Sequence, residues 1–130
     1  MIDENKTWQV GIKGLVFNDE GKLLLIQEPN GKWELPGGRI EHGETFHETL
    51  KREIKEEMGV ECEVLDEQPY WAWHHQMDDG RWKILLGFRT RLTSFDFIKT
   101  EECVDSKFFD KQELMELGDK LYTNGFIKFL

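Results

Sequence analysis

The apolar residues of this chain follow two spacings, one typical of strands and one typical of a helix. Short alternating or apolar runs bounded by turn residues predict strands. The predicted strands are residues 8–17, 22–27, 33–35, about 82–92 and 107–109, with extended chain over residues 60–73. Pro36-Gly37-Gly38 is expected to end the third strand. Asp78-Asp79-Gly80 predicts a hairpin turn before the long strand.

Residues 45–58 carry the strongest helical pattern. Phe46, Leu50, Ile54 and Met58 recur every four residues and so form one apolar stripe. Gly59 follows at the position where a glycine commonly ends a helix.

Two further helical segments are predicted near the end of the chain. Residues 110–113 resemble a capping box and predict a short helix, and residues 126–130 predict a final helical turn. Strands, a helix, more strands and another helix indicate one α+β domain over residues 1–130, with helices layered on a mixed sheet.

Charge and composition narrow the function. The chain has 17 basic and 26 acidic residues, a formal net charge of −9, which argues against binding a nucleic-acid polymer. A small phosphorylated ligand remains compatible if divalent cations lie between it and the protein. Residues 1–6 are polar and no apolar run is long enough for a membrane span, so we expect a cytoplasmic protein without an anchor. Cys62 and Cys103 lack a paired spacing and are interpreted as reduced thiols.

Three glutamates share one face of the predicted main helix. Glu53, Glu56 and Glu57 have i, i+3, i+4 spacing, and a helix turns by about 100° per residue. Carboxylates this close repel one another, and a hard cation such as Mg²⁺, with Mn²⁺ as an alternative, relieves the repulsion. On the helix alone, a solvated acidic face is the favoured interpretation of the spacing.

Residues around this helix favour the cation. Gly37-Gly38 allows the backbone to approach a metal or phosphate closely. Glu44 stands at the helix entrance, where the helix dipole favours a carboxylate. Arg52 is placed to orient its neighbour Glu53.

Residues 38–60 combine these features in one pattern. They read G, five residues, E, seven residues, R-E-I-x-E-E, one residue, then G-V, after Leu35-Pro36-Gly37. In this pattern the chain resembles the Nudix hydrolases, including MutT-like members, which cleave nucleoside diphosphates linked to another moiety. The resemblance implies the Nudix α/β/α sandwich. It also implies that Glu53, Glu56 and Glu57 are metal ligands, that Arg52 holds Glu53, and that the Gly37 carbonyl is an additional ligand.

The resemblance implies a reaction in which water attacks a phosphorus of the diphosphate. The metal lowers the pKa of the water and neutralises developing charge. Glu53 and Glu102 are the two candidates for the general base, because relatives often recruit a distant glutamate from such a loop. Glu101, beside Glu102, is an alternative, and an ordinary exposed loop explains both residues as well.

The sequence indicates less clearly which residues recognise the non-phosphate part of the substrate. Trp71, Trp73 and Trp82 are candidates to stack on a base, with core packing as the alternative, and His74-His75 lies nearby.

Asn124 resembles an asparagine that MutT-type members use on a purine edge, although Asn124-Gly125 also fits a turn. Leu35 and Gly38, beside the metal site, complete the predicted substrate contacts. Gln27-Glu28 stands where many relatives carry a basic pair, which weakens the case for a triphosphate held by side-chain cations.

Three functions fit these residues. The first is a Mg²⁺-dependent hydrolase of a nucleoside diphosphate derivative or a nucleoside triphosphate. The second is a catalytically silent Nudix module that binds a nucleotide as a regulator, and the third is non-hydrolytic chemistry on a diphosphate ester. A homodimer is a further hypothesis, suggested by tryptophans on the predicted hairpin.

Overall fold

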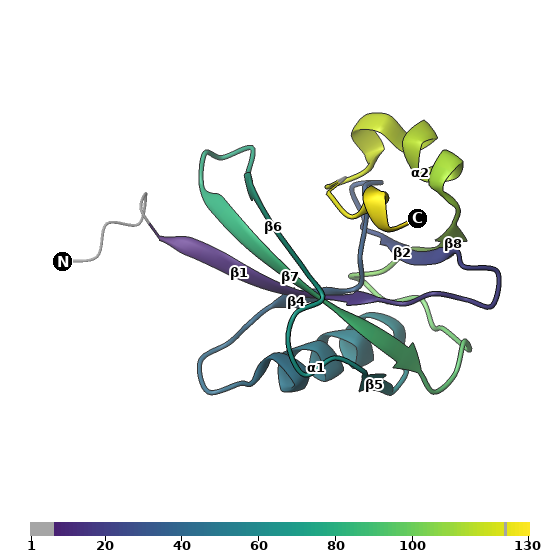
Figure 1. Ribbon diagram of the computed structural model, residues 1–130, viewed down its shortest axis with the longest axis horizontal. Helices are drawn as coiled ribbons and strands as arrows, with labels where there is room; N and C mark the ends of the chain where they lie inside the picture. Colours follow the sequence, from purple (N-terminus) through teal and green to yellow (C-terminus); the bar gives the residue numbers. More distant parts are fainter. Residues whose placement is uncertain (1–6, 124) are drawn as a thin grey trace.

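The computed structural model describes residues 7–123 and 125–130, whose strands form two sheets (Figure 1). The larger sheet has the order β4-β1-β7-β5, with β6 also paired to β7, and the smaller sheet has the order β3-β2-β8. β1 and β7 are parallel and their other neighbours antiparallel, so the larger sheet is mixed, as predicted. The strands are β1 (Trp8–Leu15), β2 (Leu23–Gln27), β3 (Trp33–Glu34), β4 (Gly37–Arg39), β5 (Cys62–Val64), β6 (Trp71–Gln76), β7 (Trp82–Leu92) and β8 (Asp105–Phe109). The helices are α1 (Phe46–Met58), α2 (Lys111–Leu117) and the 3₁₀ turns η2 (Gly118–Lys120) and η3 (Ile127–Phe129).

The main helix begins and ends as its sequence predicts. The Thr45 hydroxyl accepts a hydrogen bond from the Glu48 N–H, and the Glu48 carboxylate accepts one from the Thr45 N–H. Thr45 is therefore the cap and not the first helical residue. Gly59 ends the helix in the left-handed conformation, with φ 73°.

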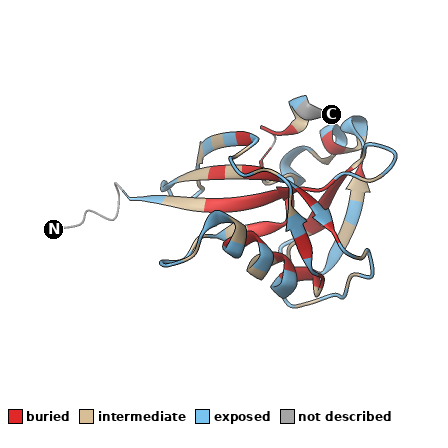
Figure 2. Ribbon diagram, turned by 60° about the horizontal axis from the view of Figure 1, so that its bottom comes forward, coloured by how far each residue is buried: buried red, intermediate tan, exposed pale blue. Residues whose placement is uncertain are grey.

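The two helices cover different parts of the sheets. Helix α1 packs on one face of the larger sheet, and α2 with the C-terminal turn packs beside the smaller sheet (Figure 1). Strand β2 links the two hydrophobic cores, because Leu24 and Ile26 face the α1 core while Leu23 and Leu25 face the other. Buried residues consequently run along the sheets and the inner side of α1 (Figure 2).

Two strand predictions were incomplete. Gly37 and Gly38 do not simply end a strand, because they form β4 and pair antiparallel with β1. Glycine has low strand propensity, so only the distant partner strand reveals this pairing.

The predicted extended segment 60–73 divides into β5 and β6. Between them the Asp66 carboxylate accepts hydrogen bonds from the backbone N–H and the guanidinium of Arg89, and the chain leaves the sheet.

Other predicted segments are confirmed. The turn at residues 78–80 joins β6 to β7, with Gly80 at φ 89°. Asp110 caps α2 in a capping box with Glu113. The C-terminal turn is 3₁₀ rather than α. In the described part of the chain, the helices are all too short or too polar to cross a bilayer.

Candidate functional site

A groove of about 550 Å³ lies beside α1 and is lined mainly by acids. Its carboxylates come from four parts of the chain: the end of β2, β3, α1 and the loop before β8. They are Glu28, Glu34, Glu53, Glu57, Glu101 and Glu102. The lining is completed by Pro29, Asn30, Gly37, Gly38 and Arg39.

The outer end of the groove holds a cluster of three carboxylates. Oxygen atoms of Glu53, Glu56 and Glu102 all lie within 4.8 Å of one another. Burial raises the pKa of Glu53, and the charges of Glu56 and Glu102 add to the rise while Arg52 opposes it. Three oxygen donors whose charges repel one another fit a hard divalent cation, so this donor set suits Mg²⁺ or Mn²⁺.

Arg52 fixes one side of this cluster. Its Nη1 donates to Glu53 Oε1 over 2.9 Å, and its Nε and Nη2 donate to the two carboxylate oxygens of Glu44 over 2.7 and 3.0 Å. Those hydrogen bonds from Arg52 are the main reason why the pKa of Glu44 falls to about 2. The predicted contact between Arg52 and Glu53 is present, and Glu44 holds the arginine in place.

Gly37 and Gly38 each lie too close to a neighbouring group to leave room for a side chain. A Cβ at Gly38 would lie 2.4 to 2.6 Å from the Glu53 carboxylate, so a side chain there would displace Glu53. Gly37 has φ 129°, and a Cβ there would lie 2.0 Å from the Ile12 carbonyl oxygen. Both positions therefore require glycine.

A buried lysine, Lys13, contacts two of the groove-lining residues, Glu34 and Gly37, at what we call the inner end of the groove. Lys13 Nζ lies 3.3 Å from Glu34 Oε1, 3.3 Å from the Leu35 carbonyl oxygen and 3.4 Å from the Gly37 carbonyl oxygen. Burial alone would lower the pKa of Lys13, but Glu34 and Glu57 outweigh it and the pKa is raised. Burial also raises the pKa of Glu57, although Lys13 and a 2.8 Å hydrogen bond from the Gly37 N–H oppose this.

A threonine anchors the loop that carries the distant acids. Thr100 Oγ1 donates to the Glu57 carbonyl at the end of α1 over 2.9 Å and accepts from the Cys103 N–H over 3.2 Å. Glu101 and Glu102 then both line the groove, but Glu102 is the one whose carboxylate joins the outer cluster.

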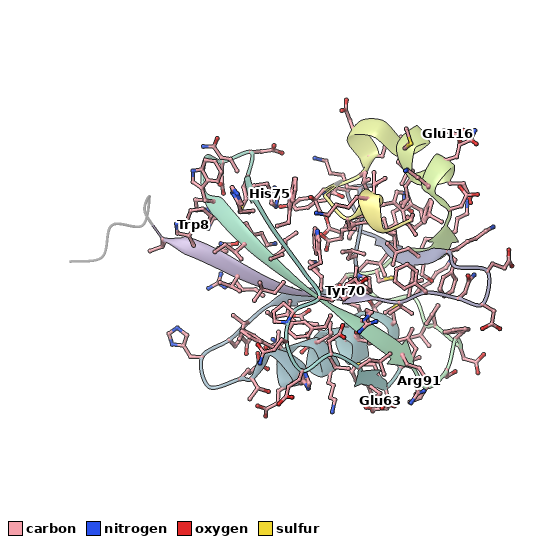
Figure 3. All side chains as sticks on the ribbon, in the orientation of Figure 1. Trp8, Glu63, Tyr70, His75, Arg91 and Glu116 are labelled. Atoms are coloured by element: carbon pink, nitrogen blue, oxygen red, sulfur yellow. The ribbon has the colours of Figure 1, made fainter. Side chains whose placement is uncertain are left out.

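A second hollow, of about 470 Å³, lies between β6 and the segment after α2. Trp73, His75 and Tyr122 supply its aromatic lining. The His75 ring lies edge-on to Tyr122, with centroids 5.6 Å apart, and Lys83 Nζ lies 5.7 Å from the Tyr122 centroid. Figure 3 shows His75 on β6, and its buried Nε2 has no hydrogen-bond partner in the described part of the chain.

The residues predicted to contact substrate are not brought together. Gly38 lines the groove and Trp73 lines the second hollow. Leu35 is 1% exposed, so its side chain is not available to a ligand. Trp82 packs against Trp8 on the other face of the sheet from Trp73. Asn124 lies outside the described residues.

The sequence analysis missed Lys13, Glu34 and Thr100. Lys13 did carry a signal, because it is a charged residue inside the buried end of β1. Glu34 and Thr100 had no comparable signal, since their importance depends on contacts with distant segments.

Comparison with known proteins identifies the domain family of this chain. The NUDIX domain model matches residues 7–128. The chain is 32% identical over 114 residues to nucleoside diphosphate-linked moiety X motif 6 of Xenopus laevis, covering 83% of this chain and 52% of that protein. It is 45% identical over 71 residues to the 8-oxo-dGDP phosphatase NUDT18 of Homo sapiens, covering 47% of this chain and 22% of that protein. The chain thus spans no more than about half of either relative's length.

Solved structures of similar proteins have the same fold as this chain. A MutT protein from Methanosarcina mazei Go1 superposes with a TM-score of 0.77 at 21% identity, covering 95% of this chain and 91% of that one, which shows the fold. A UDP-X diphosphatase superposes with a TM-score of 0.68 at 26% identity, covering 83% of this chain and 53% of that one. The domain match and the α+β fold with its mixed sheet lead to one conclusion: this chain belongs to the Nudix family.

Proposed function

We propose that the chain is a divalent-cation-dependent hydrolase of nucleoside diphosphate-linked compounds or nucleoside triphosphates. The main support for this proposal is the cluster of Glu53, Glu56 and Glu102, whose carboxylate oxygens lie within 4.8 Å of one another. The cluster lies at a groove that is also lined by Gly37 and Gly38. Mg²⁺ is the proposed cation and Mn²⁺ its substitute, because both prefer oxygen ligands.

The names of relatives support the substrate class. One relative is an 8-oxo-dGDP phosphatase, and one similar structure is a UDP-X diphosphatase. Both names describe nucleoside diphosphates, free or linked to a further group. We therefore propose a diphosphate as the common part of the substrate.

Each groove residue has a proposed task. A bound divalent cation would neutralise phosphate charge and lower the pKa of a water molecule. Glu53 and Glu56 would hold the cation from α1, with Arg52 keeping Glu53 in position, and Glu57 would support it from the buried side. Arg39, at the groove wall, would attract the phosphate charge.

Two glutamates compete for the role of general base. Burial raises the pKa of Glu53, which makes its carboxylate a stronger base than that of an exposed glutamate. Glu102 is exposed and reaches the same cluster from the opposite loop. A pH–rate profile of Glu102→Gln beside that of Glu53→Gln distinguishes them, since the variant that lacks the base loses the acidic limb. Unchanged kinetics in Glu102→Gln would remove Glu102 from the mechanism.

The second hollow is the proposed place for the nucleoside. Trp73, His75 and Tyr122 offer ring faces and edges for a base. Tyr122 is near the groove, because its N–H donates to the carbonyl of Trp33, the neighbour of Glu34. Asn124 stays a predicted contact with the base.

A substrate panel tests the proposed function. Purified protein with Mg²⁺ is incubated with 8-oxo-dGDP, normal and oxidised nucleoside triphosphates, UDP-sugars, ADP-ribose, dinucleoside polyphosphates and capped nucleotides. We expect hydrolysis of at least one diphosphate-linked compound, abolished by EDTA and restored by Mg²⁺ or Mn²⁺. Tight binding of one compound without hydrolysis of any would instead support the regulatory module.

A further inference from the structure

The ammonium group of Lys13 fills a site made of oxygen atoms. Its three hydrogens face three acceptors: the Glu34 carboxylate at 3.3 Å and the carbonyls of Leu35 and Gly37 at 3.3 and 3.4 Å. The side chains of Lys13 and Glu34 are 4% and 9% exposed, so water does not screen this pair strongly. Oxygen donors around a buried positive charge are what a cation site requires.

Strand pairing keeps this arrangement fixed. Lys13 lies opposite Gly37 in the β1–β4 register, and the Gly14 N–H donates to the Pro36 carbonyl over 2.8 Å. The Gly37 N–H donates to Glu57. The Gly37 peptide is therefore held by Glu57 on one side and by Lys13 on the other.

A divalent ion on the Gly37 carbonyl would conflict with this lysine. Mg²⁺ binds oxygen at about 2.1 Å, so an ion on that carbonyl would lie within about 5.5 Å of Lys13 Nζ. Two positive centres at that distance in a buried place repel each other. Among the described residues Lys13 forms its ion pair with Glu34 and not with a carboxylate of the outer cluster, Glu53, Glu56 and Glu102.

We propose that Lys13 acts as a built-in cation that takes the place of one divalent ion at the Gly37 carbonyl and confines metal binding to the outer cluster. Lys13 is thus a positioning residue: it holds Gly37 and neutralises Glu34 and Glu57 without touching substrate. The inference rests on the proposed function, because it assumes that the groove binds divalent ions. The inference departs from the expectation, drawn from the family resemblance, that the Gly37 carbonyl binds a metal ion.

Counting bound Mn²⁺ by electron paramagnetic resonance tests the proposal. Wild type is compared with Lys13→Met, which removes the charge, and with Lys83→Met as a matched control. Lys83 is a half-buried lysine on the same face of the sheet, and among the described residues the hydrogen bond to the Gly37 carbonyl comes from Lys13 and not from Lys83. We expect Lys13→Met to bind one more Mn²⁺ per chain than wild type, and Lys83→Met to bind the wild-type number.

Thermal unfolding with and without Mn²⁺ gives a second readout. An ion that replaces the ammonium stabilises only the folded state, so Mn²⁺ should raise the Tm of Lys13→Met more than that of wild type or Lys83→Met. If Lys13→Met folds only with Mn²⁺ present, the proposal is supported. An unchanged Mn²⁺ count with equal Tm shifts, or a variant that stays unfolded in Mn²⁺, would overturn it.

These outcomes separate the inference from the proposed function. If wild type hydrolyses nothing in the substrate panel while Lys13→Met gains an Mn²⁺ ion, the proposed activity fails and the role of Lys13 stands. If wild type is active with Mg²⁺ and Lys13→Met gains no ion, the activity stands and the role of Lys13 fails.

Discussion

The two ends of the acidic groove handle negative charge in opposite ways. At the outer end, Glu56 and Glu102 are exposed beside the half-buried Glu53, and Arg52 at the edge of the cluster is the cation that contacts Glu53 and Glu56. At the inner end, Glu34 and Glu57 are buried and face the ammonium of Lys13. The outer end is thus suited to a metal ion that can bind and leave. The inner end already holds a covalently attached cation, the ammonium of Lys13.

The outer end of the groove therefore serves metal binding, and the inner end serves the stability of the fold. The outer carboxylates repel one another, and that repulsion is the reason why they would bind a metal. The inner carboxylates lie where an unpaired charge would be costly, so a covalently attached cation stabilises the fold there. Substitutions at the two ends should consequently affect different observables.

The largest expected effect is on turnover at the outer end. Glu53→Gln keeps the shape of the side chain but removes its charge, so we expect kcat to fall by about 10²- to 10⁴-fold. The free energy of unfolding should change by less than about 1 kcal/mol, since Glu53 is not part of a hydrophobic core. Steady-state kinetics on the best substrate, together with urea unfolding, measures both quantities.

Glu61→Gln is the matched control for Glu53→Gln. Glu61 is an exposed glutamate paired with Lys55, away from the groove lining. Its kcat should equal that of wild type. Near-normal kcat in Glu53→Gln with Mg²⁺ would show that the proposed outer site is wrong.

The inner end should show its effect in stability. Lys13→Met leaves the Glu34 charge buried without its partner, so the free energy of unfolding without metal should fall by about 3 to 5 kcal/mol. The double variant Lys13→Met/Glu34→Gln should recover part of that loss. Lys55→Met, in an exposed pair, should cost no more than about 1 kcal/mol. Equal losses for the two lysine variants in urea unfolding would contradict the contrast between the ends.

A pH-dependent effect should appear at the rim of the inner end. Burial raises the pKa of Glu28 to about 7, with the charge of Glu34 adding to the rise, from an ordinary value of 4.5. An acid whose pKa is higher in the folded state destabilises the fold as pH rises from 4.5 through 7. Glu28→Gln in EDTA should therefore be more stable than wild type at pH 8, by about 1 kcal/mol after solvent screening, and nearly equal at pH 5.

Urea midpoints at the two pH values measure this effect, and Glu61→Gln again serves as the control. A gain of the same size at pH 5 and pH 8 would mean that Glu28 does not change its charge over this range in the folded protein.

The same contrast explains how much could be predicted from sequence. The outer end was largely predictable because Glu53 and Glu56 share one helix, and helical spacing places them on one face. Glu102 was one of two candidate acids until the fold brought its carboxylate to the cluster. The inner end was not predictable, because the contacts of Lys13 with Glu34 and Gly37 join segments more than 20 residues apart.

The smallest effect is expected at Thr100, where the two ends are joined through the backbone. Thr100→Val removes a hydroxyl that donates to the Glu57 carbonyl and accepts from the Cys103 N–H, while keeping the side chain's shape. The free energy of unfolding should fall by about 1 kcal/mol. If this anchor also positions Glu102, kcat should fall several-fold, well short of the loss in Glu53→Gln. Thr100→Ser, which keeps the hydroxyl, should restore both quantities. A stability loss with wild-type kcat would show that Glu102 does not need this anchor to reach the outer cluster.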